Sequence, residues 1–167
     1  MNAGAMGIAT FDVVETLHMI TPTGARLKAR RDDVAVQYRS CPILHQNIAV
    51  GATLAGQAAD PAEVKIRMDQ YSKKRWESQP AQPSAGCIFK NPLPSMPAGK
   101  LIDELGLKGS KVGRAMVSDV HANFIVNLGG ASAKEVLELI GLVREKAYRE
   151  RGLQLLMEVE IVGEELQ

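Results

Sequence analysis

The sequence predicts an α+β protein in which a sheet-forming first part precedes a mixed part of helices and short strands. Three observations predict this class. The first sixty residues carry β-type alternation broken by turn sequences, a helix start stands at residue 60, and one long amphipathic stripe follows residue 132. From about residue 60 the expected order is helix, loop, helix, strands, helix and strand, which indicates helices layered on a sheet.

Two stretches in the first part have the pattern of strands. Residues 14–19 alternate between two faces, and the turn sequence Thr21–Gly24 follows them, so we expect a hairpin there. Residues 47–56 form another short β-rich run, which adds a further strand to the same sheet.

The change of character at residue 60 marks a helix. Asp60 is a favourable N-cap, Pro61 suits the first helical position, and Glu63 lies near the positive end of the helix dipole. Three larger apolar residues share one face of this helix: Val64, Met68 and Tyr71. The helix ends before the proline-rich loop at residues 79–86.

The second part contains a short helix, a long helix and short strands. Residues 98–109 predict a helix that ends at Gly106 or Gly109, and residues 113–118 and 123–130 predict strands. Ser132 and Glu135 form a capping box at the start of the long helix, which Gly152 ends. Its apolar stripe comprises Val136, Leu139, Ile140, Val143 and Ala147. Residues 155–163 predict a closing strand.

Composition excludes several classes of function. The net charge is +1 and aromatic residues make up 4% of the chain, so neither nucleic acid nor an anionic membrane is an expected partner. There is no apolar run long enough to span a bilayer and no secretory signal pattern, so a cytoplasmic location is expected. The two cysteines make no disulfide framework, and the dispersed histidines show no metal-ligand spacing.

Six motifs occur in an order that is specific to one family. They are NAGAMG near the start, YRSC at 38–41, PSAGCIFKNP at 83–92, AGKLIDELGLKG, VSDVHANFIVN and MEVEIVG. Together they closely resemble the UDP-N-acetylenolpyruvoylglucosamine reductases, flavoenzymes that complete UDP-N-acetylmuramate in bacterial peptidoglycan synthesis. The resemblance covers nearly the whole chain and is closest to the shorter-loop subtype of the family.

The resemblance implies two domains. Residues 1–58 are similar to the C-terminal part of the FAD-binding domain, a PCMH-like sheet, and residues 60–167 to the complete substrate-binding domain. Family members are roughly twice as long, so this sequence begins within the flavin-binding unit. A sheet that begins in mid-domain exposes edges and apolar surface, which predicts either poor order over roughly the first 55 residues or a partner, such as a second copy, over that surface.

The family's catalytic positions fall on three residues here. Cys87 stands where the family has its proton donor, usually a serine, and a thiol with a pKa of about 8.5 is a plausible substitute. Glu158 aligns with the glutamate that steadies the enol form of the intermediate, and Arg39 with the arginine that assists it. From the residues alone, the favoured interpretation of Cys87 is a small buried hydrophobe, and that of Glu158 and Arg39 is a solvated charge; the resemblance reverses this preference.

Other site residues follow from the same resemblance. The substrate-contact positions correspond to Tyr38, Lys90, Asn91 and His121, although a lone histidine is more often structural. The flavin-facing turn corresponds to Asn2, Ala3, Gly4, Ala5 and Gly7, whose small side chains would let backbone amides approach the cofactor. Two departures bear on the flavin: Glu160 replaces an arginine of the family, and Arg114 replaces a glycine.

The resemblance implies an FAD-dependent enzyme that reduces UDP-N-acetylenolpyruvoylglucosamine with electrons from NADPH. The alternative is a non-catalytic module that binds the UDP-sugar, or packs on a partner, without flavin. Flavin uptake and substrate-dependent NADPH oxidation distinguish the two hypotheses.

Overall fold

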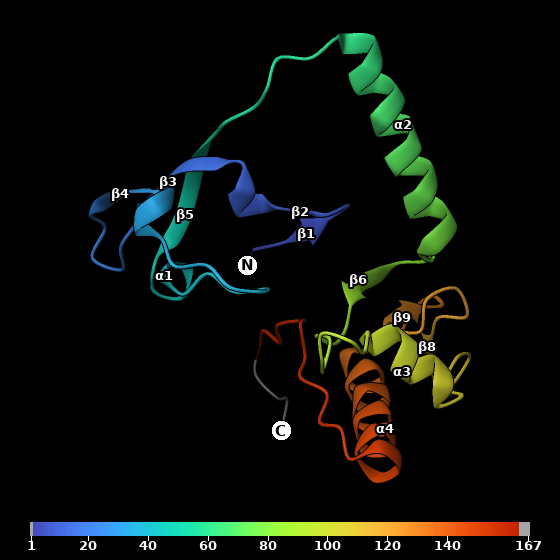
Figure 1. Cartoon of the computed structure of the whole chain (residues 1–167). Coiled ribbons are helices and arrows are strands. Elements are labelled where there is room, and N and C mark those ends of the chain that lie inside the picture. The colour runs from blue at the N-terminus through green and yellow to red at the C-terminus, as the bar shows by residue number, and fades with distance from the viewer. Residues whose placement is uncertain (1, 164–167) are drawn as a thin grey trace. The chain divides into compact units, whose positions relative to one another are not determined.

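The computed structural model describes residues 2–163, which form two compact units (Figure 1). The described residues up to Tyr71 make unit 1, and those from Ser72 on make unit 2, with the boundary inside helix α2 (Pro61–Ser78). Each unit contains its own hydrophobic core. Across residues 2–163, no helix combines the length and apolar character needed to cross a membrane.

Unit 1 is built on an antiparallel sheet of three strands. β3 (Val14–Ile20) lies between β4 (Arg26–Arg30) and β5 (Ile48–Leu54), so the predicted strands are confirmed. The predicted turn between β3 and β4 is also present. The amide of Gly24 donates to the Thr21 carbonyl at 2.9 Å, and Gly24 has a φ of +83°, which glycine adopts at low cost.

Unit 1 also contains short elements outside the three-stranded sheet. They are β1 (Gly4–Ala5), β2 (Ile8–Ala9), the 3-10 turns η1 (Thr10–Asp12) and η2 (Arg31–Asp33), and α1 (Ile43–Gln46). The buried residues are Phe11, Val14, Leu17, Met19, Val34 and Cys41. Every residue of the edge strand β5 is exposed. Self-association through this sheet stays a prediction.

Helix α2 begins as the sequence predicts. The Asp60 carboxylate accepts a hydrogen bond from the Ala62 amide at 2.8 Å, which caps the first turn. The described residues bury none of the helix, and Met68 on its apolar face is 65% exposed. The start of α2 therefore depends on local capping rather than on packing.

Unit 2 consists of an antiparallel sheet and two helices (Figure 1). The strand order is β6 (Ser84–Cys87), β9 (Phe124–Asn127), β8 (Ala115–Val117) and β7 (Lys111–Val112). Helices α3 (Ala98–Glu104) and α4 (Ala133–Arg151) pack with β8 and β9 into one core. The buried face of α4 comprises Leu139, Ile140, Val143 and Ala147, as the sequence stripe predicts.

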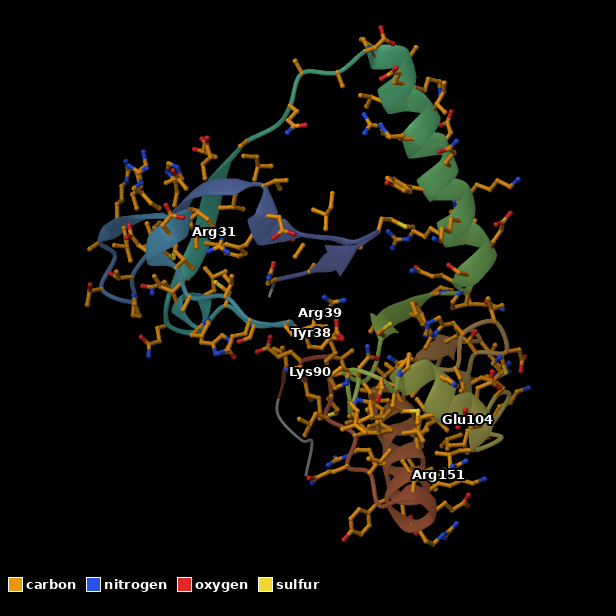
Figure 2. All side chains as sticks on the ribbon, viewed as in Figure 1. Arg31, Tyr38, Arg39, Lys90, Glu104 and Arg151 are labelled. Carbon is orange, nitrogen blue, oxygen red and sulfur yellow. The ribbon has the colours of Figure 1, made fainter. Side chains whose placement is uncertain are left out.

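Both ends of helix α4 carry the signals that the sequence predicts. The Glu135 carboxylate accepts from the Ser132 amide at 2.7 Å, and the Ser132 hydroxyl accepts from the Glu135 amide at 3.2 Å. Gly152 ends α4 with a φ of +63°. An ion pair of 3.8 Å joins Arg151 at the end of α4 to Glu104 at the end of α3 (Figure 2).

The expected closing strand at residues 155–163 is wrong. Within this segment only Met157 makes a bridge, to Phe89, and the chain bends directly afterwards. A regular strand needs a hydrogen-bonded neighbour along its whole length. Among the described residues, this segment has such a neighbour only at residues 156–158, which pair with residues 88–90. As a result Glu158 is half-buried and Glu160 is exposed, whereas in a regular strand both side chains would lie on the same face.

Candidate functional site

Cys87 ends strand β6 directly after a bulge. Ser84 pairs with Val126 and Cys87 with Phe124, so three steps along β6 match two steps along β9. Gly86, within the extra step, has a φ of +85°, a conformation that other residues adopt at a cost. A bulge of this kind re-aims the next side chain, and bulges are frequent beside active sites. The Cys87 side chain is half-buried.

The residues after Cys87 lie alongside the segment that carries Glu158. The Glu158 amide donates to the Ile88 carbonyl at 2.8 Å, and the Lys90 amide donates to the Leu156 carbonyl at 2.9 Å. Backbone hydrogen bonds therefore place Glu158 next to the residue that follows Cys87. These two predicted catalytic residues, 71 positions apart in sequence, belong to one local frame in unit 2.

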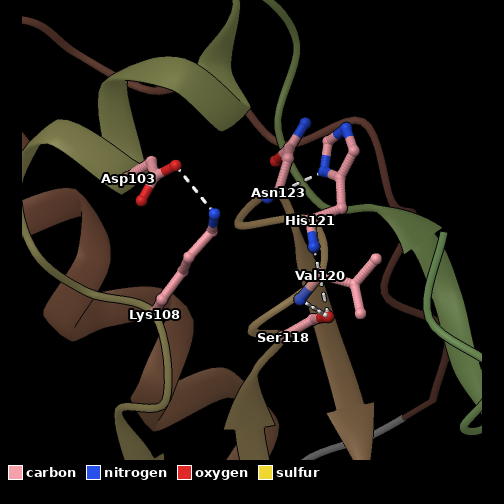
Figure 3. Close-up of polar contacts among 6 residues, drawn as sticks. All are labelled: Asp103, Lys108, Ser118, Val120, His121 and Asn123. Carbon is pink, nitrogen blue, oxygen red and sulfur yellow. Dashed lines mark hydrogen bonds and ion pairs between the residues drawn. The ribbon is translucent and has the colours of Figure 1, made fainter. Parts of the chain in front are cut away.

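His121 lies in the turn before β9, where hydrogen bonds join it to Ser118 and Asn123 (Figure 3). Its amide donates to the Ser118 hydroxyl at 3.3 Å, and its Nδ1 accepts from the Asn123 amide at 3.2 Å. The ring meets Phe124 edge-on at 4.9 Å. Burial lowers the pKa of His121 below 6.5, and the charge of Lys108 acts in the same direction against a backbone hydrogen bond. A neutral ring with Nδ1 accepting carries its proton on Nε2.

The two other predicted substrate contacts in unit 2, Asn91 and Lys90, make hydrogen bonds with the main chain. The Asn91 side-chain oxygen accepts from the Ala98 amide at 3.0 Å, which satisfies a donor at the start of α3. Lys90 is half-buried beside the Leu156 carbonyl that its amide contacts. Whether either side chain contacts substrate stays a prediction.

Arg39 belongs to unit 1 and occupies a strained turn. Gln37 and Ser40 exchange backbone hydrogen bonds of 3.0 and 3.1 Å, which leaves Tyr38 and Arg39 at the tip. Arg39 has a φ of +52°, which is uncommon for a residue with a side chain and is concentrated at functional sites. Its guanidinium lies 5.0 Å from the Tyr38 ring centre, and Nη2 donates to the Gly4 carbonyl at 3.4 Å (Figure 2).

The predicted flavin-facing residues form the β1–β2 hairpin. Met6 and Gly7 make its turn with φ values of +52° and +83°, and Asn2 is tied down because its side-chain oxygen accepts from the Phe11 amide at 3.1 Å. Residues 3–7 are all exposed. A Cβ at Gly4 would lie 3.2 Å from Arg39 Nη1, so the glycine leaves room for the guanidinium. That this hairpin faces the flavin stays a prediction.

The two departures from the family pattern have different surroundings. Glu160 is exposed near the end of the described chain. Arg114 follows Gly113 in the turn between β7 and β8, where its backbone and charge act on the Glu135 carboxylate. The pKa of Glu135 is lowered mainly by its hydrogen bond from the Ser132 backbone, with Arg114 adding to the effect.

The structure also identifies residues that sequence reasoning missed. Asn123 and Ser118 are the buried polar side chains of the described residues, 4% and 2% exposed. The available signal was an asparagine inside the apolar run 122–126, because a buried amide needs hydrogen-bond partners. From residue 2 to residue 163, no three His, Cys, Asp or Glu side chains gather as a metal-binding group.

Comparisons with known proteins agree on one family. The family described as UDP-N-acetylenolpyruvoylglucosamine reductase, C-terminal domain, matches residues 79–162. The chain is 41% identical to a UDP-N-acetylenolpyruvoylglucosamine reductase of Syntrophomonas wolfei, covering 99% of this chain and 56% of the relative. It is 43% identical to that of Geobacter metallireducens, covering 99% of this chain and 55% of the relative.

A solved structure shows the same relationship. The crystal structure of the Thermus caldophilus UDP-N-acetylenolpyruvylglucosamine reductase matches with a TM-score of 0.83 and 39% identity. The match covers 96% of this chain and 57% of that chain. The present chain thus spans a little over half the length of the relatives it matches.

Proposed function

Because the chain belongs to the UDP-N-acetylenolpyruvoylglucosamine reductase family, we propose that it takes part in reducing this UDP-sugar to UDP-N-acetylmuramate during peptidoglycan precursor synthesis in the cytoplasm. The main support in this chain is the hydrogen bond from the Glu158 amide to the Ile88 carbonyl, which joins the backbone of the candidate acid to the residue that follows the candidate proton donor. Bound FAD, reduced by NADPH, would supply the hydride that adds to the enolpyruvyl double bond.

The residues of unit 2 would handle the proton. Cys87 would give its thiol proton to the carbon that becomes carbanionic, so the S–H bond breaks, a C–H bond forms and a thiolate remains. The Glu158 carboxylic acid would donate a hydrogen bond to the enol oxygen that develops on the substrate carboxyl group. Half-burial of both side chains limits the access of water and strengthens these interactions.

The residues of unit 1 would bind charge. Arg39 can form a bidentate contact with the substrate carboxylate, since the strained turn and the Tyr38 ring fix its guanidinium. The exposed hairpin residues Ala3, Gly4 and Ala5 would contact the flavin. Lys90, Asn91 and His121 would contact the UDP-sugar.

The test is turnover of the purified chain with FAD, NADPH and UDP-N-acetylenolpyruvoylglucosamine. We expect substrate-dependent NADPH oxidation that Glu158→Gln lowers by about a hundredfold or more. The matched control is Glu138→Gln, an exposed glutamate on helix α4 outside the proposed site, which leaves turnover unchanged. Cys87→Ala should abolish most turnover and Cys87→Ser should keep part of it, because a hydroxyl also donates a proton.

A second candidate is a UDP-sugar-binding module without catalysis. The observation in its favour is that unit 2 has its own core and contains the whole family match at residues 79–162. Calorimetric titration with the UDP-sugar, with and without FAD, separates the cases. Binding without flavin uptake or turnover favours the module, and absence of both binding and turnover contradicts both functions.

A further inference from the structure

We propose that Asn123 is a positioning residue whose side-chain amide fixes the backbone that carries Cys87 and meets Glu158. The inference rests on the proposed roles of those two residues. Asn123 does not belong to the predicted catalytic set, and it lies in the turn just before β9.

The Asn123 amide extends the sheet beyond the end of a strand. The Phe89 amide donates to Asn123 Oδ1 at 2.9 Å, and Asn123 Nδ2 donates to the Phe89 carbonyl at 2.8 Å. A side-chain amide has the same donor and acceptor as a peptide group. Since β9 starts at Phe124, opposite Cys87, Asn123 supplies the next ladder pair with its side chain.

The main chain of Asn123 also forms a hydrogen bond with the segment that follows Cys87. The Asn123 carbonyl accepts from the Ile88 amide at 2.8 Å, so one residue makes three hydrogen bonds to residues 88 and 89. The Ile88 carbonyl, in turn, accepts from the Glu158 amide. Asn123 therefore holds the first residue after Cys87 from one direction while the Glu158 segment holds it from another.

Burial makes this arrangement difficult to replace. Asn123 is 4% exposed and Phe89 is 2% exposed, so water cannot take over the two bonds of the amide. A small non-polar residue at 123 would leave the Phe89 peptide groups unsatisfied, and the segment would move to satisfy them. Displacements of about 1 Å at a reacting group can lower rates by about a hundredfold.

The test compares Asn123→Ala with the matched control Asn127→Ala, at the other end of β9. The Asn127 side-chain oxygen also accepts two backbone hydrogen bonds, from Gly129 at 2.8 Å and Ala131 at 3.0 Å. We expect Asn123→Ala to lower kcat by about a hundredfold with little change in KM. We also expect the alkylation rate of Cys87 by iodoacetamide, read by mass spectrometry, to change by about tenfold. Asn127→Ala should alter neither quantity.

The outcomes separate this inference from the proposed function. Equal kcat and equal Cys87 alkylation in both folded variants overturn the inference. Absence of turnover in the unmodified chain contradicts the proposed function, while the alkylation rates still decide the positioning role. If Asn123→Ala does not fold, hydrogen exchange of the unmodified chain decides: a Phe89 amide as protected as that of Val126 in β9 supports the role, and rapid exchange overturns it.

Discussion

Replacing Gly99 by alanine tests how tightly the candidate site is packed against helix α3. A Cβ at Gly99 would lie 2.9 Å from His121 Cε1, 3.4 Å from its Nδ1 and 3.6 Å from the Asn123 Cβ. The ring cannot retreat freely, because it contacts Phe124 edge-on and its Nδ1 accepts from the Asn123 amide. The extra methyl group therefore pushes on His121, whose Nδ1 accepts a hydrogen bond from Asn123, the residue proposed to position the Cys87 segment.

The magnitude follows from two opposing effects. Alanine in place of glycine gains about 0.5–1 kcal/mol of helix stability where it fits. Overpacking by one methyl group costs about 1–3 kcal/mol. The net expectation for Gly99→Ala is a loss of about 1 kcal/mol. The control is Gly141→Ala in α4, where nothing lies within 4 Å of the added Cβ, so only the gain applies.

The assays are urea unfolding of both variants and an NMR titration of the His121 ring. Because burial is the main cause that lowers the pKa of His121, a displaced ring should titrate closer to 6.5. The reasoning is refuted if Gly99→Ala stabilises the chain as much as Gly141→Ala does and His121 titrates as in the unmodified protein.

Two further predictions concern unit 2. Gly113→Ala should destabilise by about 1–2 kcal/mol from its φ of +53° alone, and by more because its Cβ would overlap the Glu135 carboxyl group. When Glu135 is also replaced by alanine, the part of the loss caused by the overlap should vanish. If urea unfolding shows that Gly113→Ala costs the same free energy with Glu135 present and absent, the overlap does not contribute. The lowered pKa of His121 means that its stabilisation is present above pH 6.5 and is lost as the pH falls from 6.5 through the native pKa. Unfolding free energies between pH 7.5 and 5 should show this slope in the unmodified chain and in an exposed-histidine control, His45→Gln, but not in His121→Gln.

Helix boundaries followed from sequence because their determinants are local. Asp60 caps α2, Ser132 and Glu135 cap α4, and Gly152 ends it, all within one turn of the residues they serve. The end of α3 was open between two glycines, and the structure selects the first, Gly106, with its φ of +66°.

The closing segment shows where local patterns fail. Within residues 155–163, positions 157–161 alternate apolar and acidic side chains, but a strand forms only where a neighbour offers backbone groups, and this depends on tertiary structure. The partner of Asn123 is 34 positions away, so sequence offers only a polar residue within an apolar run. The φ of +52° at Arg39 likewise has no sequence signal, because its turn contains neither glycine nor asparagine at that position.

The proposed chemistry divides between the two units in a way that each unit's own structure supports. In unit 2 main-chain hydrogen bonds and the Asn123 amide hold the backbone that carries the two residues proposed to handle the proton. In unit 1 a strained turn and the carbonyl of Gly4 hold Arg39, the residue proposed to bind the substrate carboxylate. Substitutions at Gly4 should therefore affect anion binding, and substitutions at Asn123 proton transfer. Measuring substrate affinity and kcat separately for the two variants tests this division directly.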